Sequence, residues 1–194
     1  MKKILLIIIF LNIFYNHAYS IEPDKFVQST VNKASKILEK NISKEDKING
    51  LKIIAKETVD IKGIGFYSLG SARKVLNDSQ KRTYFQLFEN YFLKSFSSRL
   101  SEYTNPKIEV IGKKIINKNY TIVNSILIGT SERPEVKIDW RIYTKNPHNP
   151  LIRDLIIEGL SLVRTQKEEF ASILNSNDGN IKTLFKTLEN FANK

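Results

Sequence analysis

The sequence predicts an α+β domain in which helices cover one face of an antiparallel sheet of four to five strands. Before Pro106, apolar residues recur every three to four positions, which is typical of amphipathic helices. After Pro106 they alternate with polar residues, and short turns separate successive strand-like segments. Helical spacing returns after Gly159. Helices on one face of such a sheet are expected to enclose an apolar pocket.

Residues 1–20 have the pattern of a secretory signal peptide. Two lysines follow the initiating Met, and a small-x-small sequence ends at Ser20. The apolar run between them, residues 4–14, is shorter than the roughly 20 residues that span a bilayer. We therefore expect cleavage after Ser20, which leaves residues 21–194 as a single domain outside the cytoplasm.

Two amphipathic helices are predicted at the start of this domain. The first spans residues 22–40, and Pro23 suits its opening turn because the first helical position needs no N–H partner. Ser43 begins a capping-box-like sequence. The apolar positions that follow it predict a second helix to about Val59.

Gly63 and Gly65 interrupt the helical pattern, so only a short apolar helix or turn is expected at 66–70. A third helix is predicted from an Asn-Asp cap at residue 77 to about Tyr103. One face of this helix carries a stripe of four aromatic rings: Phe85, Phe88, Phe92 and Phe96. The stripe is either ordinary core or the wall of a large hydrophobic cavity, and the sequence leaves both interpretations open.

Four strands joined by short turns are predicted after the helices, at 107–117 with a bulge near Gly112, at 120–129, at 135–144 and at 151–157. Successive strands with short turns favour an antiparallel meander. The third strand alternates most clearly, with Val136, Ile138, Trp140 and Ile142 on one face and Lys137, Asp139, Arg141 and Tyr143 on the other.

A sharp turn is expected to carry the last strand into a helix. Gly159 permits the turn because glycine enters the region of positive φ freely. Ser161 is a candidate N-cap for a helix that reaches about Leu174. The sequence around Ser161 begins like a nucleophile elbow, but Val163 occupies the position of the second glycine. We therefore interpret Ser161 as a cap. A final amphipathic helix follows Gly179.

Composition narrows the possible chemistry. The chain has no Cys, which excludes disulfides, thiol catalysis and Cys-type zinc sites. His17 lies in the predicted leader, so His148 alone remains for metal or triad chemistry. The formal net charge of +11 favours anionic partners, but the lysines are spread along the chain and no basic-aromatic motif points to nucleic acid.

Asp139, Asp154 and Glu158 are candidates for a pair of catalytic carboxylates. On alternating strands such residues are usually solvated, or paired with an arginine such as Arg141 or Arg153. No phosphate-cradling glycine loop or metal-binding helix motif is present. By elimination, binding is favoured over catalysis.

The turn and its surroundings resemble the MlaC family, also called the toluene-tolerance family, of periplasmic phospholipid-binding proteins. The resemblance rests on the Asp-x-x-x-Glu-Gly-Leu-Ser sequence at 154–161 and on the alternating strand at 136–140. A Leu-Gly pair at residue 69 and the Gln80-Lys81 helix start also match. Lys81 stands where the family usually has Arg, and Gln166-Lys167 where Tyr-Arg is frequent.

The resemblance implies a periplasmic carrier that holds phospholipid acyl chains in an apolar pocket between sheet and helices. The carrier would exchange lipid between an outer-membrane lipoprotein complex and the substrate-binding component of an inner-membrane ABC transporter, a route that maintains outer-membrane lipid asymmetry. Phospholipid would be cargo rather than a cofactor, and no catalytic residue or metal is implied. The candidate lipid-binding residues are Val136, Ile138, Trp140, Ile156, Leu160, Phe88 and Phe92, with Thr165 and Lys167 at the pocket mouth.

Two other functions stay open. One is a secreted enzyme with an NTF2-like apolar pocket that acts on a small hydrophobic substrate through Asp154 or Glu158. The other is a secreted interaction module with a solid core and no ligand. A continuous apolar cavity between the sheet and the aromatic helix would favour the carrier over the interaction module.

Overall fold

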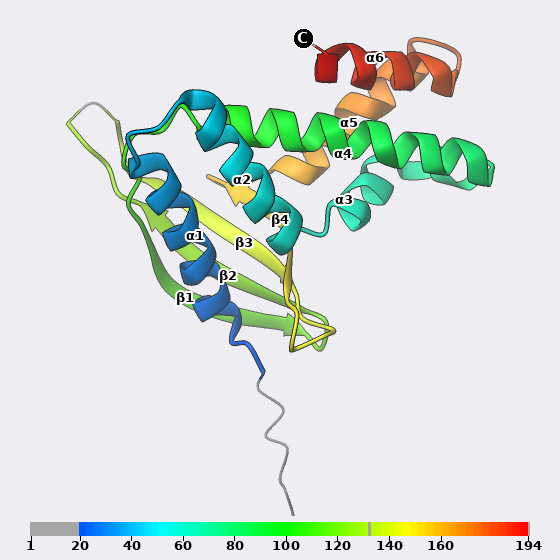
Figure 1. Cartoon of the computed structure of the whole chain (residues 1–194). Helices are drawn as coiled ribbons and strands as arrows, with labels where there is room; N and C mark the ends of the chain where they lie inside the picture. Colours follow the sequence, from blue (N-terminus) through cyan, green and yellow to red (C-terminus); the bar gives the residue numbers. More distant parts are fainter. Residues whose placement is uncertain (1–19, 132, 194) are drawn as a thin grey trace, which may run out of the picture.

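The computed structural model describes residues 20–131 and 133–193, so the predicted signal peptide lies outside the described residues except for Ser20 (Figure 1). The helices before the sheet are α1 (Pro23–Glu39), α2 (Lys44–Thr58), α3 (Ile61–Ser68), the 3-10 helix η1 (Gly70–Lys74) and α4 (Asp78–Leu100). The strands are β1 (Ile108–Asn117), β2 (Tyr120–Leu127), β3 (Val136–Tyr143), β4 (Leu151–Ile157) and β5 (Leu160–Ser161). The last helices are α5 (Leu162–Asn175) and α6 (Ile181–Asn193).

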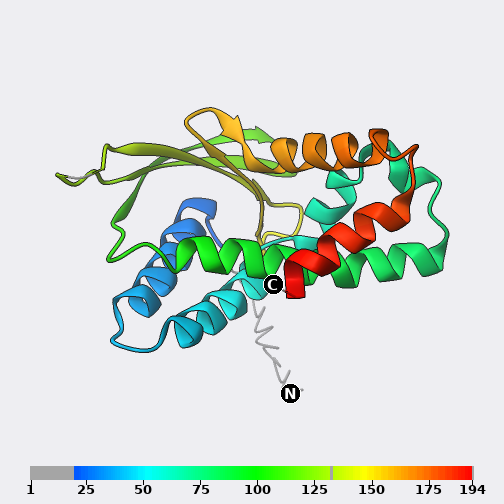
Figure 2. The same cartoon turned by 90° about the horizontal axis from the view of Figure 1, so that it is seen from above.

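The strands form one antiparallel meander in the order β1-β2-β3-β4-β5, which confirms the predicted α+β fold. Figure 2 shows the sheet on one side of the molecule and helices α1 and α2 on the other, with α4 running along its length. Helices α3, α5 and α6 pack around α4 beyond the β4 edge of the sheet. In the described part of the chain, no helix is long and apolar enough to cross a membrane.

Two of the predicted helix starts have the expected caps. The amide of Asp46 donates to Ser43 Oγ at 3.0 Å, and Asn77 and Gln80 form a reciprocal capping box. Each cap satisfies N–H groups that a helix start otherwise leaves without a partner. Helix α4 ends at Leu100, slightly earlier than predicted.

The prediction that Gly63 and Gly65 end the helical pattern is wrong, because both lie inside α3. A Cβ atom at Gly65 would stand 2.8 Å from Cδ1 of Phe88, so glycine lets α3 approach α4 closely. At Gly63 a Cβ would meet the carboxylate of Asp60 at 2.4 Å, and the Gly63 amide donates to that carboxylate at 2.8 Å. The lack of a Cβ at both glycines therefore allows close contacts, with Phe88 at Gly65 and with Asp60 at Gly63, and neither glycine ends the helix.

Strand β3 alternates as predicted, with Ile138, Trp140 and Ile142 buried towards the helices. The expected bulge in β1 is present between Val110 and Gly112. An irregularity in β4 was not expected: Ile142 pairs with Ile152 and Arg141 with Asp154, which leaves Arg153 as an extra residue in β4. The bulge changes which residues of β4 face the helices.

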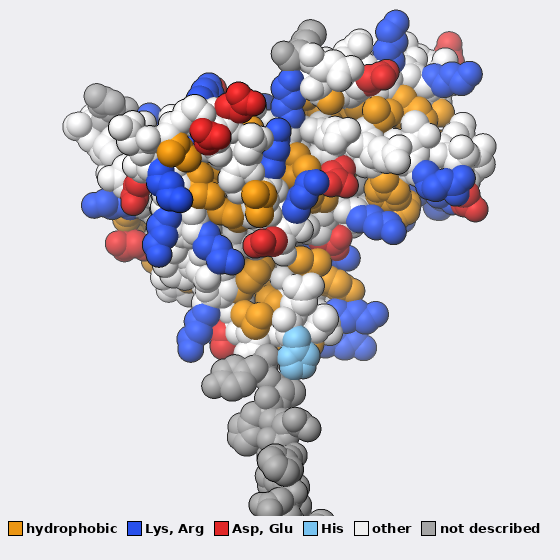
Figure 3. Space-filling view, in the orientation of Figure 1, with side chains coloured by type: hydrophobic (Ala, Val, Ile, Leu, Met, Phe, Trp, Pro, Cys, Tyr) orange, Lys and Arg blue, Asp and Glu red, His pale blue; other side chains and the backbone are white. Residues whose placement is uncertain are grey.

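Lysine and arginine side chains are scattered over the face shown in Figure 3, without one continuous basic patch. This distribution agrees with the spread of lysines along the sequence. Charge on this face therefore does not single out a binding surface. The hollows between the elements are more informative.

Candidate functional site

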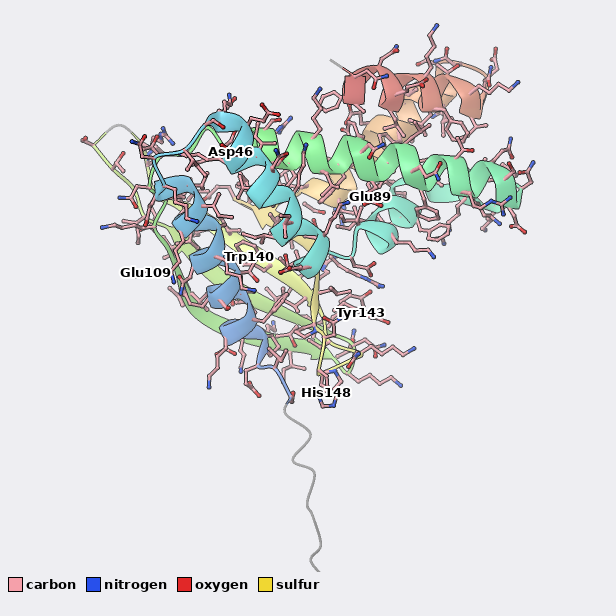
Figure 4. The ribbon with its side chains drawn as sticks, viewed as in Figure 1. Asp46, Glu89, Glu109, Trp140, Tyr143 and His148 are labelled. Atoms are coloured by element: carbon pink, nitrogen blue, oxygen red, sulfur yellow. The ribbon has the colours of Figure 1, made fainter. Side chains whose placement is uncertain are left out.

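An apolar cavity of about 150 Å³ lies between α1, α2, the end of α4 and the helix-facing side of the sheet. Trp140 lies on this side of β3, between the sheet and the helices (Figure 4). The described residues that line the cavity include no Lys, Arg, Asp or Glu. Its helical wall comes largely from Val31, Leu38, Leu51, Ile54, Val59 and Phe96.

The serine and threonine hydroxyls in the lining are already hydrogen-bonded to the backbone. Thr30 Oγ1 donates to the carbonyl of Phe26 at 2.9 Å, and Ser35 Oγ donates to the carbonyl of Pro106 at 3.0 Å. Thr58 likewise donates to a carbonyl of its own helix. A donor that is satisfied inside the fold does not attract a polar ligand. The cavity therefore offers its occupant an apolar surface.

The indole of Trp140 is held in place by a short chain of hydrogen bonds. Its Nε1 donates to Ser125 Oγ at 2.8 Å, and that hydroxyl donates to the carbonyl of Ile138 at 3.1 Å. The polar end of the ring is thereby satisfied, and its apolar surface is left to line the cavity. This pattern fits contact with hydrocarbon.

One end of the cavity leads towards the surface. Tyr103, Pro106 and Leu127 line both the cavity and an outer hollow of about 750 Å³, which we call the end hollow. Lys107 and Arg133 also line the end hollow, and the Arg133 guanidinium lies 5.4 Å from the centre of the Tyr103 ring. Two cationic groups therefore stand where an occupant of the cavity would reach solvent.

Three of the predicted lipid-binding residues lie at these hollows. Ile138 and Trp140 line the apolar cavity, and Val136 lines the end hollow. Ile156 pairs with Asp139 and so faces away from α1, α2 and the cavity. Leu160 is 60% exposed in the turn and does not line the cavity. Contact of any of these residues with lipid stays a prediction.

The two residues predicted at the pocket mouth lie elsewhere. Thr165 is exposed on α5, where its hydroxyl donates to the carbonyl of Ser161 at 3.0 Å. The ammonium of Lys167 lies 5.2 Å from the ring centre of Tyr67, between α5 and α3. Neither residue lines the cavity or the end hollow.

The aromatic stripe of α4 divides between the two interpretations that the sequence left open. Phe88 is 1% exposed and packs against Tyr84, Phe92 and Phe170 at 5.6 to 6.2 Å between ring centres, so it belongs to the core around α3 and α5. Phe92 stacks between Phe88 and Phe96. Phe96 alone of the stripe lines the cavity.

Many of the lining residues that the sequence did not identify come from α1 and α2. Their signal was present as the apolar face of each amphipathic helix. Such a face predicts burial, but it does not show whether the partner surface is packed core or a cavity wall.

The turn after β4 is built around Asp154, which is 3% exposed rather than solvated. Its carboxylate accepts bonds from Ser161 Oγ at 2.6 Å and from the Val163 amide at 3.1 Å. Ser161 Oγ also accepts from the Arg164 amide at 3.0 Å, so its predicted role as N-cap is confirmed. Both side chains are therefore engaged in starting α5.

Comparisons with known proteins agree with this geometry. The family model described as MlaC protein matches residues 28–190. The fold is similar to that of a phospholipid-binding protein from Ralstonia solanacearum, solved in complex with a phospholipid, with a TM-score of 0.73 and 16% sequence identity. The alignment covers 89% of this chain and 97% of that one. At this identity the structural match demonstrates a shared fold.

Proposed function

Because the chain belongs to the MlaC protein family, we propose that it binds phospholipid and holds the acyl chains in the apolar cavity. The lining is the observation that carries the proposal: it has no charged side chain, and its serine and threonine hydroxyls are hydrogen-bonded within the fold. Burial of each methylene group contributes about 0.8 kcal/mol. A long acyl chain therefore gains much from such a lining, whereas a polar ligand would gain little.

The cavity must widen to hold a phospholipid. Its volume of about 150 Å³ is below the range of about 300–1,000 Å³ in which small-molecule sites fall. Helix α1 is held to the sheet by polar contacts, among them Gln28 with the backbone of Ile108 and Val110. We expect α1 and α2 to move away from the sheet as the tails enter, because these helices supply the wall opposite Trp140.

The end hollow is the proposed position of the headgroup. It shares the lining residues Tyr103, Pro106 and Leu127 with the cavity, and Lys107 and Arg133 supply positive charge beside the phosphate. Tails in the cavity and a headgroup in solvent would leave the lipid accessible to a receiving complex. This arrangement suits a carrier that must release its cargo.

The cellular role that we propose is transfer of phospholipid through the periplasm. After removal of residues 1–20, the single domain 21–194 would carry lipid between an outer-membrane lipoprotein complex and the substrate-binding component of an inner-membrane ABC transporter. No bond is made or broken in this role. The engaged carboxylate of Asp154 and the capping role of Ser161 support carriage over the enzymatic alternative.

Native mass spectrometry of gently purified protein tests the proposal. Wild-type protein is expected to carry a phospholipid mass that disappears on denaturation. Ala34→Phe places a ring in the cavity and should abolish the lipid mass, whereas Ala171→Phe, on the exposed side of α5, should retain it. Lipid-free wild-type protein that also fails to take up added phospholipid would contradict the proposal.

Trp140 supplies a second readout, because it is the single tryptophan of the chain and lines the cavity. Phospholipids with brominated acyl chains should quench its fluorescence, and lipids brominated on the headgroup should not. Equal quenching by both kinds of lipid would place the tails outside the cavity.

A further inference from the structure

A second hollow lies on the opposite face of the sheet, and we call it the arginine cleft. Consecutive strand residues point to opposite faces, so Trp140 lines the apolar cavity while Arg141 lines this cleft. Its walls come from α3, the start of α5 and strands β1 to β4. Its volume of about 470 Å³ falls within the range of about 300–1,000 Å³ that is usual for small-molecule sites.

Arg153, the bulged residue of β4, is fixed in this cleft. Its Nε donates to Asp60 Oδ2 at 2.6 Å, and one terminal nitrogen donates to the hydroxyl of Tyr120 at 2.5 Å. The guanidinium carbon also lies 3.7 Å from the centre of the Tyr143 ring. A guanidinium has five N–H donors, so these bonds leave donors available in a fixed orientation.

Two further arginines line the same cleft, Arg141 and Arg164. A terminal guanidinium nitrogen of Arg141 lies 3.8 Å from Oδ2 of Asp154, which is too long for a hydrogen bond. The backbone amide of Arg164 donates a hydrogen bond. Its side chain has no hydrogen bond or ion pair with any residue in the ranges 20–131 and 133–193. The donors of both groups are therefore largely unused within the fold.

The acids of the cleft do not offset these donors. Both oxygens of Asp154 already accept bonds from Ser161 and from the Val163 amide. The carboxylate of Asp60 accepts from Gly63 and Arg153. Three arginines therefore face two carboxylates, which leaves one positive charge in excess, and each carboxylate oxygen already accepts one bond within the fold.

Apolar side chains form the rest of the wall. Ile64 of α3, Ile122 of β2 and Val163 of α5 line the cleft beside the arginines. A ligand that fits has an anionic group with several acceptor oxygens next to an apolar part. The planar fork of a guanidinium matches the oxygens of a phosphate group in a bidentate manner.

We propose that the arginine cleft is a binding site for a phosphate group, with Arg141, Arg153 and Arg164 as its ligands. The phosphate can belong to a lipid headgroup or to a free phosphate. The site is separate from the apolar cavity, because the sheet lies between them, and it does not depend on the proposed carriage of lipid tails.

Nuclear magnetic resonance offers one reporter on each face of the sheet. The Arg153 Nε–H group reports on the cleft, and the Trp140 indole N–H group reports on the cavity. The probes are inorganic phosphate and, separately, dihexanoyl phosphatidic acid, each titrated against sodium chloride at matched ionic strength. Inorganic phosphate should shift the Arg153 signal saturably and leave the Trp140 signal in place.

The paired variant Arg141→Gln with Arg164→Gln tests the ligands. Loss of a charge-assisted hydrogen bond should weaken binding about tenfold for each arginine. The matched control, Arg73→Gln with Arg82→Gln, removes two exposed arginines that lie outside the cleft and should keep wild-type affinity. Arg164→Gln alone, at an exposed side chain without partners in the described fold, gives a variant with little risk to folding.

The outcomes separate the two sources of phosphate. Binding of both probes at Arg153 shows that the phosphate suffices, and binding of the lipid alone shows that the apolar wall is needed. The proposal is overturned if neither probe shifts Arg153 saturably, or if the control variant weakens binding as much as the cleft variant. Failure of tail binding would be seen separately, as a Trp140 signal that does not respond to long-chain phospholipid.

Discussion

The two faces of the sheet present opposite chemistry within single strands. Towards α1 and α2, the apolar cavity has an uncharged lining and only about 150 Å³ of space. On the other face, the arginine cleft has about 470 Å³ and three guanidinium groups. Trp140 and Arg141 are neighbours in β3 and belong to different hollows. The strict alternation of β3 therefore separates a site suited to hydrocarbon from a site suited to an anion.

The two hollows also differ in what holds them open. The apolar cavity has walls of aliphatic side chains, which can repack and close the space. In the arginine cleft, Asp60 and Tyr120 fix Arg153 by hydrogen bonds. We therefore expect the cavity to change volume with its ligand and the cleft to keep its shape. The following variants test how far the two sides are independent.

Phe88→Ala should have the largest effect on stability. The ring is 1% exposed among Tyr84, Phe92 and Phe170, and Phe→Ala changes in packed cores cost about 3–5 kcal/mol. Phe96→Ala should cost less, because Phe96 is only partly buried and borders existing space. Urea unfolding measures both. Equal losses in the free energy of unfolding would show that the aromatic stripe is one continuous core. The assignment of Phe96 to the cavity wall would then be wrong.

Asp154→Ala should rank next, at about 3 kcal/mol, because it leaves the Ser161 hydroxyl and the Val163 amide without their buried acceptor. Asp154→Asn keeps one acceptor oxygen and should lose less. Circular dichroism during urea unfolding gives both values. If Asp154→Ala proved neutral, the turn would not depend on this carboxylate.

Much of the fold follows from local patterns in the sequence. The caps at Ser43, Asn77 and Ser161 predict where three helices start, and the alternation of β3 predicts that Ile138 and Trp140 share the buried face. These features depend on residues a few positions apart. The family prediction is likewise confirmed, by a match over residues 28–190.

Features that depend on contacts between distant elements were not predicted. The bulge at Arg153 sets Ile156 on the face away from α1, α2 and the cavity, and no turn residue or glycine marks it in the sequence. Gly65 was read as a helix breaker because its neighbour Phe88 lies in another helix. The cavity wall in α1 and α2 was missed for a similar reason. The apolar face of an amphipathic helix predicts burial, but it does not show which surface the helix packs against.

Arg153→Gln should cost about 1–2 kcal/mol, since it removes a charge-assisted bond to the partly buried Asp60 and the contact with Tyr143. The same change should weaken phosphate binding in the cleft and leave uptake of phospholipid in the cavity at the wild-type level. Thermal unfolding measures the loss of stability, calorimetric titration with phosphate measures binding in the cleft, and native mass spectrometry measures lipid uptake. Loss of lipid uptake by stably folded variant protein would show that the two hollows are coupled.

Lys113→Gln should have the smallest effect on stability, below about 1 kcal/mol, because its pairs with Glu22 and Asp24 are largely solvated. These pairs tie the start of α1 to β1, on the cavity side of the sheet. Lys113 holds the pKa of Asp24 below its ordinary value of 3.8, so this contribution is complete above that pH and is lost as the pH falls through the lower folded value. Wild-type protein should therefore lose slightly more stability than Lys113→Gln between neutral pH and pH 3.

If α1 moves when tails enter, Lys113→Gln should also exchange labelled phospholipid faster, whereas Lys186→Gln on α6 should not. An unchanged exchange rate would place the moving wall elsewhere than at the contact between α1 and β1.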